Sequence, residues 1–158
     1  MLLTPPQTVA PPSSKAGFAA LMELYENNYI YLRRLVPQLD GERDHLVSQV
    51  DHAPALYLQV TERFPYTTSV FLTHRFDACS SKESLPDLQV RIYHDARVAE
   101  VIPPLDSQAQ PPSLAWRWVA NRFLSRWLKY CLGEGHGFAM DDAEAAVIYR
   151  PEAKRWAV

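Results

Sequence analysis

The chain has 158 residues, of which 47% are hydrophobic and 22% charged, and 16 basic residues against 18 acidic ones give a formal net charge of −2. At about 150 residues folding buries roughly two thirds of the accessible surface, so this length predicts one domain with its own core. A nearly neutral chain lacks the general attraction to DNA or anionic lipid that a strongly basic domain has, and we do not expect nucleic acid as a partner.

Cysteine usage and apolar runs indicate the compartment. The two cysteines, Cys79 in a polar stretch and Cys131 in an apolar helical pattern, are too few for a disulfide framework or a zinc knuckle. The first residues lack the basic and apolar regions of a signal peptide, and about 18 consecutive apolar residues occur nowhere. We therefore expect a cytoplasmic protein that does not span a membrane.

The N-terminal third divides into a tail and a helix. Residues 1–15 are rich in proline and polar residues, and we expect a disordered tail because so little apolar surface cannot offset the entropy of ordering. In residues 16–36 apolar side chains recur at spacings of three and four, which predicts an amphipathic helix. Pro37 ends this helix.

The middle of the chain has the pattern of an antiparallel meander. Short segments rich in β-branched and aromatic residues alternate partly between apolar and polar positions, and turn residues separate them. The predicted strands are residues 46–50, 56–61, 67–73, 88–93 and 98–102.

The last two of these strands form the clearest hairpin. If a two-residue loop at Asp95 closes it, Arg91 lies opposite Glu100, and this pairing predicts a cross-strand ion pair. The alternate side chains, Val90 and Ile92 among them, then point to the other face of the sheet and into a core.

A second helix follows a proline-rich loop at residues 103–112. Residues 114–132 carry a broad apolar side, and the glycine cluster at 133–137 stops the helix. We interpret this cluster as a helix C-cap and not as a phosphate loop, because a helix C-terminus repels anions.

These elements predict an α+β fold. An N-terminal helix, about five antiparallel strands and a C-terminal helix packed on the sheet account for the pattern. We expect a single domain over residues 16–135 and a variable C-terminal tail over residues 136–158.

Known catalytic motifs are absent, and candidate binding residues gather at turns and on one sheet face. Glycine-rich phosphate loops, nucleophile elbows, HExxH and CxxC do not occur, and we expect neither a metal nor a cofactor. The alternative to a binding role is that the charged residues at these turns are exposed to solvent and only stabilise the turns. The candidate ligand- or partner-binding residues carry a charge, an aromatic ring or an imidazole: Arg63, Tyr66, Arg91, Tyr93, His94, Asp95 and Glu100.

Several segments in order resemble the YqiB-like family of small bacterial proteins. The stretch VRIYHDARVAEV at residues 90–101 is the most specific, and residues 21–37, 62–68 and 121–132 add to it. The resemblance spans about residues 18–135. It implies a cytosolic protein with no established biochemical role, and no catalytic residues are carried over from it.

Two classes of function remain open. The favoured one is a non-catalytic binding or adaptor module for an unknown protein partner or small ligand, and a homodimer is compatible with it. The alternative is a small metal-assisted hydrolase or nucleotide-ligand enzyme that uses His94, Asp95 and Glu100. In a plain hairpin Asp95 and Glu100 stand ~13 Å apart, at about 3.3 Å per residue, which argues against joint ligation of a metal.

Overall fold

The computed structural model describes residues 15–39, 44–75, 84–104 and 111–138. Residues 1–14 of the predicted tail, Cys79 and residues 139–158 lie outside them, and Lys15 belongs to the first helix. The predicted α+β architecture is confirmed within the described ranges. Its elements are helix α1 (Lys15–Leu35), strands β1 (His45–Val50), β2 (Ala53–Arg63), β3 (Thr67–Arg75), β4 (Ser84–Tyr93) and β5 (Val98–Ile102), and helix α2 (Leu114–Gly133).

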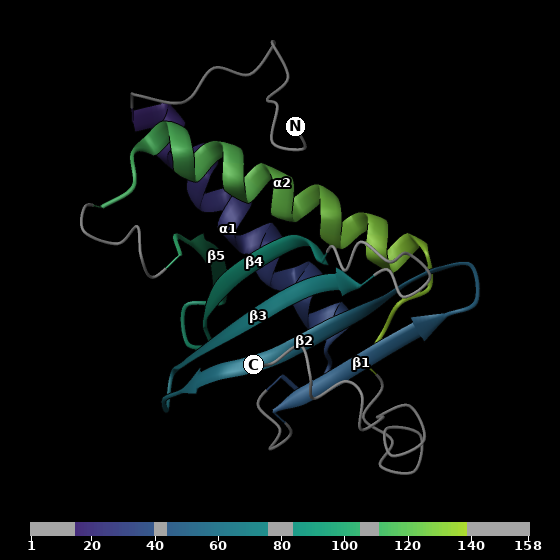
Figure 1. Cartoon of the computed structure of the whole chain (residues 1–158). Helices are drawn as coiled ribbons and strands as arrows, with labels where there is room; N and C mark the ends of the chain where they lie inside the picture. Colours follow the sequence, from purple (N-terminus) through teal and green to yellow (C-terminus); the bar gives the residue numbers. More distant parts are fainter. Residues whose placement is uncertain (1–14, 40–43, 76–83, 105–110, 139–158) are drawn as a thin grey trace.

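The five strands form one antiparallel meander in the order β1-β2-β3-β4-β5. Figure 1 shows both helices on the same face of this sheet, with the opposite face uncovered by either helix. Each strand pairs with its neighbour in sequence, as expected when short turns connect antiparallel strands.

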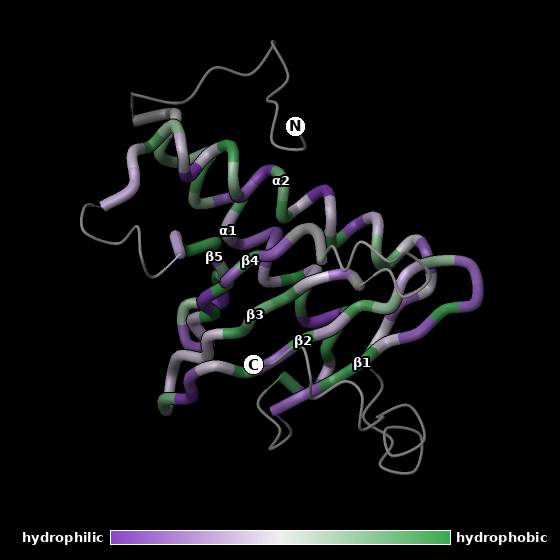
Figure 2. Tube along the Cα trace, viewed as in Figure 1, coloured by the Kyte–Doolittle hydropathy of each residue, from purple (hydrophilic) through white to green (hydrophobic). Residues whose placement is uncertain are grey.

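The core lies between the helices and the sheet. Cross-strand register aligns Val70 with Val90 and Val90 with Val101, so a row of buried valines crosses three strands. Leu32 of α1 and Leu124 of α2 are completely buried against this face. Each such side chain stabilises the fold by about 1.5–3 kcal/mol on burial. Figure 2 shows hydrophobic and hydrophilic residues alternating along both helices, as this one-sided burial requires.

Helix α2 has a defined cap at each end. The Ser113 hydroxyl accepts a hydrogen bond from the Trp116 N–H at 3.1 Å and so begins the helix. At the other end the His136 N–H donates to the Cys131 carbonyl, and Gly135 adopts a φ of 97°. This Schellman motif confirms that the glycine cluster is a C-cap.

Packing continues beyond residue 135, where the sequence placed the end of the domain. The Phe138 N–H donates to the Leu35 carbonyl at 2.8 Å, and the Phe138 ring is buried in the core. The segment that follows α2 therefore contributes to the core as far as the structure describes it.

The hairpin between β4 and β5 has the predicted register but a different turn. Arg91 pairs with Glu100 in the backbone ladder. The turn, however, occupies residues 94–97, and the Arg97 N–H donates to the Tyr93 carbonyl at 2.8 Å. Arg97 takes a positive φ of 58° to close this four-residue turn, so the predicted two-residue loop is wrong.

Neither helix in the described ranges is long and apolar enough to cross a membrane.

Candidate functional site: an arginine-lined groove at the hairpin tips

The β2–β3 and β4–β5 turns lie at the same end of the sheet, because β2 and β4 run in the same direction (Figure 1). The His94 N–H donates to the Tyr66 carbonyl at 2.9 Å and so joins the two turns. The His94 Nε2 lies 2.8 Å from the Thr68 hydroxyl, which fixes the imidazole ring at this end. The two tips therefore form one structural unit.

Helix α1 crosses the sheet beside these tips and leaves two open cavities. The smaller has a volume of about 470 Å³ and lies between α1 and both turns. It is lined by Tyr29, Arg33, Arg63, Phe64, Pro65, Thr68 and His94.

The larger cavity has a volume of about 700 Å³ and lies between α1 and the β4–β5 turn. It is lined by Glu26, Tyr29, Ile30, Arg33, Arg34, Ala96 and Arg97. Tyr29 and Arg33 line both cavities, so the two are adjacent, and together they are called the tip groove below.

The tip groove carries an excess of positive charge. Arg63 forms an ion pair with Asp44 at 3.2 Å. Within the described ranges Arg33, Arg34 and Arg97 form no ion pair, and Glu26 is the one acidic residue that lines either cavity. The C-terminus of α1 offsets only about half an elementary charge, which is far less than three guanidinium groups contribute.

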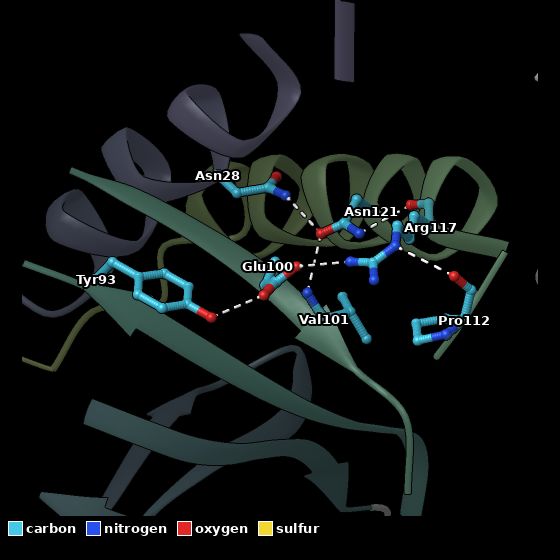
Figure 3. Close-up of polar contacts among 7 residues, drawn as sticks. All are labelled: Asn28, Tyr93, Glu100, Val101, Pro112, Arg117 and Asn121. Carbon is cyan, nitrogen blue, oxygen red and sulfur yellow. Dashed lines mark hydrogen bonds and ion pairs between the residues drawn. The ribbon is translucent and has the colours of Figure 1, made fainter. Parts of the chain in front are cut away.

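A second polar cluster lies at the β5 edge of the sheet (Figure 3). The Glu100 carboxylate accepts a hydrogen bond from the Tyr93 hydroxyl at 2.8 Å and pairs with Arg117 of α2 at 3.3 Å. The predicted Arg91–Glu100 ion pair is therefore wrong, and the Arg91 Nε instead donates to Ser69 at 3.5 Å. The physical reason is that β5 is an edge strand, so a side chain from α2 can reach past it to Glu100.

Tyr93 is held in place by this carboxylate. Burial raises the pKa of the Tyr93 hydroxyl above its usual value, and the hydrogen bond to Glu100 raises it further. Tyr93 thus stays protonated and acts as a donor to Glu100, which is a structural role.

Asn121 completes the cluster from the helix side. Its Oδ1 accepts a hydrogen bond from the Val101 N–H at 2.9 Å and another from Asn28 at 3.3 Å, and its Nδ2 donates to the Arg117 carbonyl at 2.8 Å. One fully buried amide therefore joins α1, α2 and the outer edge of β5, as Figure 3 shows.

A third cluster is enclosed between the sheet and α2. The His74 Nδ1 accepts a hydrogen bond from the Trp127 indole at 3.0 Å, and its Nε2 lies 3.9 Å from the Cys131 sulfur. Burial, with a smaller contribution from the neighbouring His136, lowers the pKa of His74 to about 4, while burial raises the pKa of Cys131 to about 12. A buried neutral thiol of this kind is not a nucleophile.

The structure separates the residues that sequence analysis grouped together. Arg63 and His94 line the tip groove, whereas Arg91, Tyr93 and Glu100 line neither cavity. The exposed Tyr66 contributes its carbonyl to His94, and the Asp95 carboxylate accepts from the Ala96 N–H at 2.9 Å. No group of three metal-ligating side chains occurs in the part of the chain that the structure describes.

Sequence analysis missed most of the groove. Tyr29, Arg33, Arg34 and Arg97 were interpreted as parts of a helix and a turn. The available signal was the Arg33-Arg34 pair in the last turn of α1. This signal was weak, because only tertiary packing places that turn beside the hairpin tips.

Comparison with known proteins identifies relatives but no reaction. Residues 31–137 match the family described as "Protein of unknown function (DUF1249)". The uncharacterized protein YqiB of Escherichia coli K12 is 36% identical over 128 residues, which cover 75% of this chain and 90% of that protein. The YqiB proteins of E. coli O6:H1 and O157:H7 give the same values. No solved structure matches. The predicted resemblance to YqiB is confirmed, and the chain belongs to the DUF1249 family.

Proposed function

We propose that this protein is a non-catalytic binding module and that the tip groove is its recognition surface. The observation that carries the proposal is a pair of adjacent cavities, of about 470 and 700 Å³, with three arginines that form no ion pair within the described ranges. Unpaired guanidinium groups in a concave surface favour an anionic partner or ligand.

The three residues of the enzyme alternative each have a different contact partner, which favours a non-catalytic protein. His94 contacts Thr68, Asp95 caps the backbone of its own turn, and Glu100 is engaged by Tyr93 and Arg117. Joint acid–base or metal chemistry requires these groups to converge on one reacting atom. Their separate contacts favour structural roles for Asp95 and Glu100.

The proposal places the protein in the cytoplasm. Cys131 is a free, buried thiol. A free cysteine is typical of a reducing compartment.

The experiment compares capture by groove and non-groove variants. Wild-type protein is immobilised, incubated with soluble cell extract and eluted, and mass spectrometry quantifies the retained proteins and small molecules. The groove variant is Arg33→Glu/Arg97→Glu. The matched control is Arg126→Glu/Lys129→Glu on the exposed side of α2, which changes the net charge equally.

We expect the control variant to retain the same species as wild type. The groove variant should retain less than about a tenth of the amount of each species that wild type retains. Circular dichroism first verifies that every variant is folded. A further variant, Arg91→Ala/Tyr93→Ala, tests the sheet face that neither helix covers (Figure 1), which is called the open sheet face below. Equal retention by the groove variant and wild type would contradict the proposal, as would a loss confined to the Arg91→Ala/Tyr93→Ala variant.

A further inference from the structure

The larger cavity is suited to concentrated negative charge. Arg33, Arg34 and Arg97 all line it, and the one carboxylate in the lining is that of Glu26, on the same helix as Arg33 and Arg34. A guanidinium group binds phosphate through two parallel hydrogen bonds, and such charge-assisted bonds are roughly twice as strong as neutral ones. Three such groups in one cavity favour a ligand that carries several negative charges within a few ångströms.

The smaller cavity is suited to a flat ring. Phe64 is 60% exposed, and Tyr29 and Pro65 line the same cavity. Phe64 and Thr67 exchange two backbone hydrogen bonds across the β2–β3 turn, at 2.8 and 3.3 Å. These bonds fix the backbone from which the ring projects, and a base stacked on an aromatic ring gains about 1–3 kcal/mol.

The two cavities are adjacent and share Arg33 and Tyr29 in their linings, so a ligand that extends past these side chains reaches both. Their volumes lie within the roughly 300–1,000 Å³ of typical ligand sites. A peptide made only of acidic residues fits less well, because it has no flat ring to stack on the exposed Phe64. A nucleic acid polymer needs basic surface beyond the groove, which a chain of net charge −2 does not favour.

We infer that the tip groove binds a nucleoside di- or triphosphate, with the phosphates among Arg33, Arg34 and Arg97 and the base beside Phe64 and Tyr29. The inference rests on the proposed binding function and names its ligand class. No chemical step is involved, because the ligand is held and not converted.

The test is isothermal titration calorimetry with defined probes at low ionic strength. The panel consists of ADP, GDP, CDP and UDP, together with pyrophosphate, adenosine and hexaglutamate. We expect at least one nucleoside diphosphate to bind at least tenfold more tightly than pyrophosphate, adenosine or hexaglutamate. Arg33→Ala should weaken both that nucleotide and pyrophosphate at least tenfold.

The matched variants separate the two halves of the groove. Phe64→Ala should weaken the nucleotide about tenfold and leave pyrophosphate unchanged, since only the base contacts the ring. Arg126→Ala on α2 should change neither. The inference is overturned if no nucleotide exceeds pyrophosphate, if hexaglutamate binds most tightly, or if Phe64→Ala weakens both probes equally. A mixed result separates the two proposals. If no nucleotide binds in the titrations but the groove variant still captures less from cell extract than wild type, the binding function stands and only the ligand class is wrong.

Discussion

Asn121 is the residue on which the contact between the two helices and the sheet edge depends most. Its side chain is completely buried and satisfies the Val101 N–H, the Asn28 amide and the Arg117 carbonyl at once. A strand at the edge of a sheet leaves backbone groups without strand partners, and Asn121 satisfies one of them from outside the sheet.

Replacing Asn121 with alanine should destabilise the fold by about 3 kcal/mol. The change leaves the Val101 N–H and the Asn28 amide buried without their acceptor, and each unsatisfied group costs about 1–3 kcal/mol. The matched control is Asn27→Ala on the exposed side of α1, where we expect a change within about 0.5 kcal/mol. Urea unfolding at pH 7 measures both free energies. Equal values would show that the Asn121 contacts do not stabilise the protein.

His74 is a buried group whose protonation affects the stability of the fold. It is 4% exposed, and Trp127, Cys131, His136 and the ring of Tyr130 surround it. Its pKa is about 4 in the folded protein and 6.5 in the unfolded chain, so the folded state favours the neutral imidazole. The unfolded chain therefore binds more protons between these two pKa values, and stability falls as the pH drops from 6.5 toward 4.

The variant His74→Gln isolates this effect, because the glutamine carbonyl can still accept from Trp127 while it does not titrate. We expect wild type to be more stable than His74→Gln at pH 7. The difference in their free energies of unfolding should be smaller by about 2 kcal/mol at pH 4.5. The control is His52→Gln, whose side chain is 66% exposed and contacts Glu134 at 2.9 Å, a surface pair that contributes at most about 1 kcal/mol. Urea unfolding at the two pH values measures the free energy of unfolding of each protein. The role of His74 would be contradicted if the difference between wild type and His74→Gln were the same at both pH values.

At the scale of elements, the C-terminal cap of α2 connects the helix to the last packed segment. Gly135 has a φ of 97°, and the residues that follow it carry His136 and Phe138 into buried positions. A Cβ on Gly135 would meet its nearest described atom, the Val50 Cγ1, at an ordinary 3.8 Å. The glycine is therefore required by the backbone conformation and not by a lack of space.

Gly135→Ala should cost about 1–2 kcal/mol, which is the usual penalty for a left-handed residue with a Cβ atom. Gly137→Ala is the matched control, since a Cβ there meets nothing within 4 Å and the residue has no positive φ. Thermal unfolding should show a lower midpoint for the first variant and little change for the second. Similar midpoints for both would mean that the cap conformation contributes nothing.

The elements themselves could be predicted well, for physical reasons. Apolar spacing of three and four marked both helices, and partial alternation marked the strands, because each helix buries one side and each strand turns every second side chain toward the helices. The β4–β5 turn was predicted incorrectly, since nothing local shows that Arg97 takes a positive φ. The partner of Glu100 was missed because Arg117 is distant in sequence and reaches it only after α2 packs against β5.

At the scale of the whole molecule, the candidate site arises from topology. A meander places the β2–β3 and β4–β5 turns at one end, and α1 adds its arginines there. Arg63 and His94 were among the predicted residues, since charged and imidazole side chains at turns are common in binding sites. The α1 half of the groove depends on how the helix crosses the sheet, which the sequence pattern does not specify.

The predicted homodimer stays a prediction. Of the two edge strands, β5 is the less suitable for pairing with a second copy, because Asn121 already accepts the Val101 N–H. A dimer formed through the sheet would therefore use β1.

The most direct test of the account is to map the bound surface by amide chemical shifts in ¹⁵N-labelled protein titrated with the tightest-binding nucleoside diphosphate. We predict shift changes in three separate segments, residues 29–34, 63–68 and 94–97, and none at residues 87–91 of the open sheet face or 125–130 of α2. Shift changes confined to the sheet face or to α2 would contradict the claim that α1 and the two hairpin tips form the recognition surface.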